Sequence, residues 1–73
     1  IRQGFGSYFW PGGDKYTGEW DNNMRNGYGI LKKEGQDSES GMWFNGKLEK
    51  PEENSAVIDI LKNKYPDIDL LDD

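Results

Sequence analysis

The sequence predicts a mainly β protein, built as a single-layer antiparallel sheet of stacked β-hairpins with one C-terminal α-helix. Three observations support this fold class. A 23-residue repeat occupies the first two thirds of the 73-residue chain, strand-like segments alternate with glycine- and asparagine-rich turns, and the composition changes at Pro51. Because hairpins that recur at a fixed period contact mainly their neighbours, we expect the sheet to grow in one direction as a solenoid.

The repeat is found by aligning residues 4–23 with residues 27–46 without a gap. Seven of the twenty aligned positions are identical, more than a glycine-rich composition produces by chance. The identical pairs are Gly4 and Gly27, Gly6 and Gly29, Gly12 and Gly35, Asp14 and Asp37, Gly18 and Gly41, Trp20 and Trp43, and Asn22 and Asn45. Two units of one structural repeat are therefore present.

Each unit contains strand-like segments separated by turn residues. Residues 5–10 are rich in aromatic side chains and end in the turn sequence WPGGD at 10–14. In the next strand, residues 15–20, an aromatic face formed by Tyr16, Gly18 and Trp20 alternates with a polar face. Asparagine- and glycine-rich turns then lead into the strands predicted at residues 28–33 and 39–44.

Glycine between two aromatic residues weakens a strand unless a neighbouring ring or backbone needs the space of the missing Cβ. We therefore expect paired glycines on one strand to form a shallow trough in which a tryptophan lies. The structural glycines of the repeat are predicted to be Gly4, Gly6, Gly18, Gly27, Gly29 and Gly41.

The aromatic side chains of the repeat can fill a narrow core, or they can line an exposed groove that binds a partner. Both uses remain open at this level. The candidate partner-binding residues on the repeat are Tyr8, Trp10, Tyr16, Trp20, Tyr28 and Trp43.

The chain after the repeat has a different composition. All ten glycines and all three tryptophans precede Pro51. Residues 1–49 carry a net charge of −1, whereas residues 50–73 carry −4. We therefore divide the chain into a repeat module at 1–49, a linker at 50–53, and an amphipathic helix with an acidic tail at 54–73.

The predicted helix spans about residues 54–65, with Asn54 or Ser55 as its N-cap, and it ends before Pro66. Its apolar face includes Val57, Ile58 and Leu61. This face can cover the open end of the sheet or bind a partner, so the three residues are further candidates for partner binding. The tail at 67–73 alternates aspartate with aliphatic residues and contains an Asp-x-x-Leu-Leu sequence, similar to acidic dileucine sorting signals.

The segment YTGEW at residues 16–20, followed by NGYG at 26–29, resembles the MORN repeat family. The resemblance covers residues 2–46, as one complete unit, the Gly-x-Gly strand of a preceding unit and a degenerate following unit. Glu39 stands where the family has tyrosine. The resemblance implies a MORN-type solenoid with an aromatic groove that binds protein segments, in a scaffold associated with cytoskeletal structures or membrane junctions. It also implies a module that is not catalytic.

The residue inventory argues against several function classes. The chain contains neither histidine nor cysteine, which removes the commonest general base, the thiol nucleophile and the usual transition-metal ligands. We therefore predict no enzymatic activity, no metal site and no cofactor. A net charge of −5 without a basic run disfavours binding to nucleic acid and direct binding to anionic lipid. The lack of cysteine permits a reducing compartment, and we expect a cytoplasmic location.

Three functions compete at this level. The first is a non-catalytic interaction or scaffold module that binds a protein segment, through the aromatic groove, the C-terminal helix or both. The second is a small-ligand module of the choline- or glucan-binding type, which needs aromatic rings converging on the ligand. The third is an accessory array end of a larger enzyme or cytoskeletal protein, with self-association through its N-terminal strand edge. Because the sequence begins within a repeat unit, we expect it to be a fragment of a longer chain.

Overall fold

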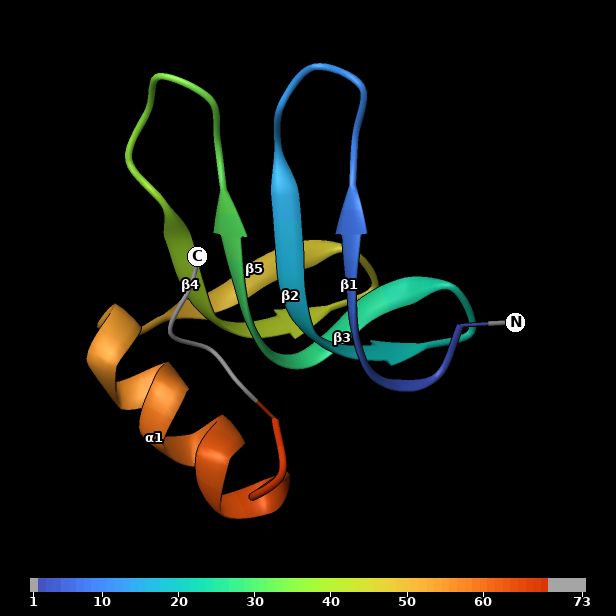
Figure 1. Ribbon diagram of the computed structural model, residues 1–73, viewed down its shortest axis with the longest axis vertical. Coiled ribbons are helices and arrows are strands. Elements are labelled where there is room, and N and C mark those ends of the chain that lie inside the picture. Colours follow the sequence, from blue (N-terminus) through green and yellow to red (C-terminus); the bar gives the residue numbers. More distant parts are fainter. Residues whose placement is uncertain (1, 69–73) are drawn as a thin grey trace.

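The computed structural model describes residues 2–68 and confirms the predicted fold class (Figure 1). Five antiparallel strands form one open sheet in chain order, followed by one helix. The elements are β1 (Gly4–Phe9), β2 (Lys15–Asp21), β3 (Met24–Lys32), β4 (Glu39–Phe44), β5 (Lys47–Pro51) and α1 (Asn54–Lys64). The described part of the chain contains no helix that is long and apolar enough to span a membrane.

The turns at the two ends of the sheet follow from the sequence. Asn22 and Asn23 between β2 and β3, like Asn45 and Gly46 between β4 and β5, have positive φ at both central positions. This is the two-residue hairpin turn whose twist matches the strands. The β1–β2 loop closes on Gly13, with φ of +104°, and its amide donates a hydrogen bond to the carbonyl oxygen of Trp10. The same turn types therefore recur with the repeat.

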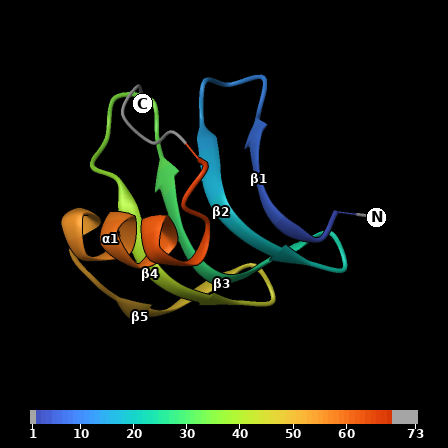
Figure 2. The same ribbon diagram turned by 60° about the horizontal axis from the view of Figure 1, so that its bottom comes forward.

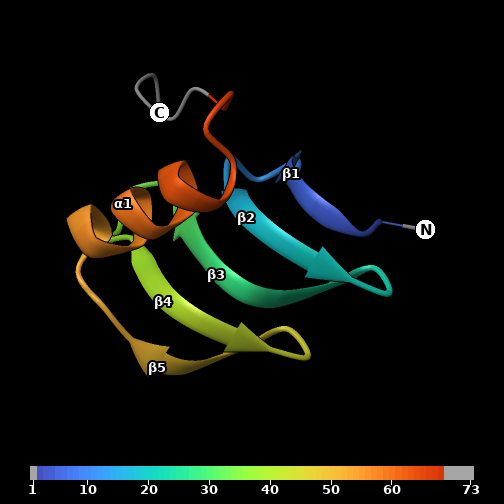
Figure 3. The same ribbon diagram turned by 90° about the horizontal axis from the view of Figure 1, so that it is seen from below.

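The sheet has two different faces, because residues paired across antiparallel strands point to the same side. The aromatic face carries a cluster formed by Tyr8, Trp10, Tyr16, Trp20, Leu31, Trp43 and Leu48. The helix face packs against α1, and its cluster is formed by Phe5, Tyr28, Ile30, Val57, Ile58, Leu61, Tyr65 and Ile68. The strands bend around α1, which lies next to β3 and β4 (Figures 2 and 3).

A row of glycines crosses the sheet where the rings need space. Gly6 pairs with Gly18, Gly18 pairs with Gly29, and Gly29 pairs with Gly41 across four strands. A Cβ at Gly29 would overlap the phenol ring of Tyr16, whereas a Cβ at Gly6 would lie 3.9 Å from the ring of Trp20. A tryptophan thus lies against the trough at Gly6, as expected, but at Gly29 the nearest ring belongs to Tyr16.

The end of the repeat differs from the prediction. β5 was not predicted, and it extends to Pro51, inside the segment assigned to a linker. The turn at Asn45 and Gly46 directs the chain back along β4, where Leu48 pairs with Trp43. β5 thereby becomes the edge of the sheet, where proline and charged residues are tolerated.

The helix begins at Asn54 and ends at Lys64, within one residue of the prediction. The predicted cap at Asn54 or Ser55 is wrong, because Glu53 occupies the N-cap position and makes no capping hydrogen bond with its side chain. Asn54 instead uses its side chain to contact Ser40 of β4, with 2.5 Å between Asn54 Oδ1 and Ser40 Oγ. The first residue of α1 is therefore tied to the sheet.

Candidate interaction surface

The centre of the aromatic face consists of three buried rings. Tyr16, Trp20 and Trp43 are 0%, 6% and 3% exposed. Tyr16 packs edge-on against both indoles, with ring centroids 5.1 Å from Trp20 and 5.6 Å from Trp43. Burial raises the pKa of the Tyr16 phenol, whose hydroxyl donates a hydrogen bond to the carbonyl oxygen of Glu19. Of the two predicted uses of these aromatic residues, these three serve as core, and they leave no open cage among them for a choline or sugar ring.

Both indoles are fixed by the same hydrogen bond in successive units. Trp20 Nε1 donates to the carbonyl oxygen of Gly6, and Trp43 Nε1 donates to the carbonyl oxygen of Gly29, each at 3.0 Å. The donors are 23 residues apart, and so are the acceptors. The repeat therefore encodes a ring position and its polar partner together.

Two arginines cover this aromatic core. The guanidinium carbon of Arg2 lies 4.8 Å from the ring centroid of Trp20, and that of Arg25 lies 4.7 Å from the ring centroid of Trp43. Stacking of this kind is a cation–π interaction. Arg25 is fixed further, because its Nη2 donates a 2.7 Å hydrogen bond to the carbonyl oxygen of Gly46. The prediction missed both arginines, although their separation of 23 residues is the period of the repeat.

The accessible part of the aromatic face lies around these arginines. Tyr8, Trp10 and Leu48 are half-buried and pack against the buried core. Tyr8 and Trp10 contact each other edge-on at 4.9 Å between centroids, and the guanidinium carbon of Arg2 lies 4.6 Å from the centroid of Tyr8. These three side chains and the two arginines form what we call the arginine–aromatic surface.

The remaining predicted binding residues lie on the helix face. Val57 and Leu61 are fully buried and pack with Ile30 of β3, and Ile58 is partly buried beside them. Tyr28 also contacts this cluster, so its predicted place among the groove aromatics is wrong. The reason is strand alternation: Tyr28 lies between Gly27 and Gly29, which point to the opposite face.

A buried carboxylate fastens the end of α1 to the sheet. Glu19 Oε1 accepts a 2.8 Å hydrogen bond from the backbone N–H of Tyr28, and Glu19 Oε2 accepts from Lys64 Nζ at 2.6 Å and from the Tyr65 hydroxyl at 2.8 Å. Burial alone would raise the pKa of Glu19, but these hydrogen bonds and the charge of Lys64 outweigh burial and lower it. The prediction treated Glu19 only as a polar-face residue of its strand.

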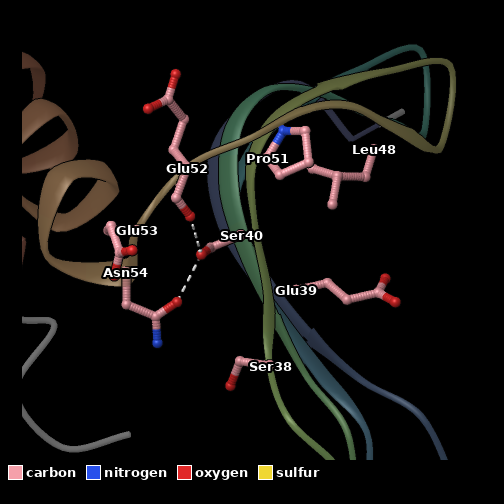
Figure 4. Close-up of a pocket in the computed structure, with 8 residues that line it drawn as sticks. All are labelled: Ser38, Glu39, Ser40, Leu48, Pro51, Glu52, Glu53 and Asn54. Carbon is pink, nitrogen blue, oxygen red and sulfur yellow. Dashed lines mark hydrogen bonds between the residues drawn. The ribbon is translucent and has the colours of Figure 1, made fainter.

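The largest hollow lies between β4, β5 and the start of α1, and its volume is about 450 Å³ (Figure 4). Ser40 lies in its wall, with Oγ 2.8 Å from the carbonyl oxygen of Glu52, so its hydroxyl is already engaged. Glu39 at the opposite wall is paired with Lys33 at 2.8 Å. Within residues 2–68, no group of three or more acidic, histidine or cysteine residues is arranged to hold a metal ion.

These features define a β-hairpin repeat module, in which glycines, indoles and arginines recur at one period on one face. The family model of the MORN repeat matches residues 1–15 and 16–37, a little over half of the chain. The chain therefore belongs to the MORN repeat family. No curated protein matches it. MORN repeats are generally modules for interaction with proteins or membranes, and the family is typically non-catalytic.

Proposed function

We propose that this chain is a non-catalytic protein-interaction and scaffold module, and that it binds a partner segment through the arginine–aromatic surface. The observation that supports this proposal most directly is the stacking of Arg2 and Arg25 on the rings of successive units. The stacked guanidinium groups are held in place by a rigid core. A partner therefore meets charged groups whose positions are fixed before it binds.

The chemistry of the surface favours a segment that carries both carboxylate and apolar side chains. A guanidinium group that stacks through its plane keeps N–H groups at its edge, and these match the two oxygens of a carboxylate. Tyr8 and Trp10 supply contact area with few rotatable bonds to restrict, which lowers the entropic cost of binding. Leu48 adds an apolar contact at the far side of the surface.

Binding through α1 is the weaker alternative. Its predicted contact residues, Val57 and Leu61, are covered by the sheet of the same chain. A partner of α1 would first have to replace that packing. The cytoplasmic location, the cytoskeletal or membrane-junction association and the role as the end of a longer array stay predictions, and the absence of cysteine supports the first of them.

A peptide selection on the immobilised 73-residue chain tests the proposal. Selected peptides are measured by calorimetry against the unchanged chain, Arg2→Gln, Trp10→Ala and the control Phe44→Ala, whose ring is 56% exposed away from the surface. We expect peptides rich in acidic and apolar residues, and a loss of about tenfold in affinity for Arg2→Gln and Trp10→Ala. Unfolding of each variant in urea shows that the fold is kept.

Two results would contradict the proposal. Peptides that bind Arg2→Gln and Trp10→Ala as tightly as the unchanged chain would place the binding site elsewhere. A tryptophan fluorescence response to choline or glucan oligomers, lost in Trp10→Ala, would instead favour the small-ligand function.

A further inference from the structure

A second surface lies on the helix face, beyond the end of α1. Phe9 of β1, Lys15 of β2 and Lys32 of β3 are consecutive partners in the register of the sheet, so they form one row across three strands. We call this row the lysine row. Phe9 is 68% exposed, and the ammonium nitrogen of Lys15 lies 5.3 Å from its ring centroid. An exposed phenyl ring flanked by ammonium groups is an unusual surface in an acidic chain.

The lysine row lies in a hollow of about 390 Å³ between the two long hairpin loops, which extend in the same direction in Figure 1. Gly13 and Gly35 of these loops line the hollow together with Lys33 and Glu34. Lys33 is neutralised by Glu39 at 2.8 Å, and Glu34 adds a negative charge at the rim. The positive charge of the hollow therefore comes from the lysine row itself.

The described chain ends on the same side of the sheet. After Pro66 it turns back with a hydrogen bond from the Ile68 N–H to the Tyr65 carbonyl oxygen, and Ile68 packs against the cluster that contains Phe5. In Figures 2 and 3 this red end lies on the helix side of the sheet near β2. The next residues of the chain therefore leave from the face that carries the lysine row.

The distances allow these residues to reach the row. Phe5 and Phe9 are four residues apart on β1, which corresponds to about 13 Å along a strand. Residues 69–73 can span about 17 Å when extended. Their sequence, DLLDD, supplies three aspartates and two leucines. Its composition is thus complementary to two ammonium groups that flank a phenyl ring.

We propose that residues 69–73 dock on the lysine row of their own chain and cover the exposed ring of Phe9. Aspartates pair with Lys15 and Lys32, and leucines contact the phenyl ring. The docked segment would occupy a surface that an acidic partner could otherwise use, so the row would be masked as long as the segment is bound. This inference concerns the helix face and is independent of the arginine–aromatic surface.

Carbodiimide cross-linking tests the proposal, because this reagent joins a carboxylate and an amine in contact through an amide bond with net loss of water. The 73-residue chain is treated at low protein concentration, and monomer and covalent dimer are separated before peptide mass spectrometry. We expect monomer links from residues 69–73 to Lys15 or Lys32. The link between Lys33 and Glu39 is the internal positive control, because these side chains are already in contact. Lys47, an exposed residue of β5, is the matched negative control.

A variant with Asp69, Asp72 and Asp73 all changed to Asn gives an independent readout. In this variant we expect Lys15 and Lys32 to react with an acetylating reagent about threefold faster, the scale of an exposed ion pair, with no change at Lys47.

The results divide clearly. Links found only in the covalent dimer would assign the segment to a second copy and overturn the proposal. Links to Lys47 as frequent as those to the lysine row would show an undirected tail, and would overturn it as well. The same holds if the control link forms and residues 69–73 yield none, or if the acetylation rates of the lysine row stay unchanged.

Discussion

The buried carboxylate of Glu19 offers the sharpest test of how α1 is held on the sheet. In Glu19→Gln the side chain keeps its size and an oxygen that can accept from the Tyr28 N–H, but it loses its charge. Lys64 then has no ion-pair partner at that position, and Tyr65 loses a charged acceptor. The substitution therefore changes the electrostatics of the attachment while it preserves its packing.

The size of the effect follows from the exposure of the partners. The Lys64 side chain is 53% exposed, so this ion pair contributes at most about 1 kcal/mol. Hydrogen bonds to a charged group contribute about 1.5–3 kcal/mol and neutral ones about 0.5–1.5, so the bonds from Tyr28 and Tyr65 lose about 1 kcal/mol together or slightly more. We expect Glu19→Gln to lower the free energy of unfolding by about 2 kcal/mol at pH 7.

The dependence on pH identifies the charge as the cause. The pKa of Glu19 is lowered in the folded chain, so its stabilising contribution is fully present above the unfolded glutamate value of about 4.3. The contribution is lost as the pH falls below that value towards the folded pKa. The stability difference between the unchanged chain and Glu19→Gln should be constant from pH 7 to about pH 5.5, and it should narrow below about pH 4.3.

Urea unfolding measures this with two probes. Circular dichroism at 222 nm follows α1, and tryptophan fluorescence follows the aromatic face, since all three tryptophans precede Pro51. The control Glu49→Gln removes an exposed carboxylate from β5 and should change stability by less than about 0.5 kcal/mol. The reasoning is refuted if Glu19→Gln matches this control at pH 7, or if the difference stays constant down to pH 3.5.

Three further predictions concern the framework. Gly29→Ala should destabilise by about 3 kcal/mol or more in urea, because the added Cβ overlaps Tyr16, whereas Gly6→Ala should cost less than about 1 kcal/mol; equal costs would contradict this. Asn45→Ala should cost about 1 kcal/mol and Asn45→Gly almost nothing, because φ is +51° there, and thermal unfolding distinguishes them. Ser40→Ala should speed hydrogen exchange in α1 more than in the strands, and uniform acceleration would speak against an anchoring role.

The repeat made most of the sheet predictable. Glycine and tryptophan at matching positions define the hairpins, and the alternation of Tyr16, Gly18 and Trp20 assigns them to one face. The same alternation contained the correction for Tyr28, since it lies between glycines that belong to the aromatic face. Sequence identity between units identifies equivalent positions, but the face of each position comes only from strand alternation.

Long-range contacts made the remainder unpredictable. β5 carries no repeat signature, and it pairs because the preceding turn brings Leu48 beside Trp43. Glu19 becomes an attachment point only because Lys64 and Tyr65, about 45 residues later, reach it from α1. Nothing in the local sequence of a strand specifies such a partner. The equivalent position in the second unit is Met42, so the attachment is not part of the repeat.

The attachment of α1 also decides between the two ways of binding a partner. Releasing the helix would expose Val57 and Leu61, which costs about 1.5–3 kcal/mol for each side chain. Loss of the hydrogen bonds to Glu19 adds about 2 kcal/mol. Because 1.4 kcal/mol corresponds to a factor of ten in affinity, a partner of the released helix would be weakened at least a thousandfold. A partner of the arginine–aromatic surface pays no such cost, since Arg25 and Trp10 are already in position.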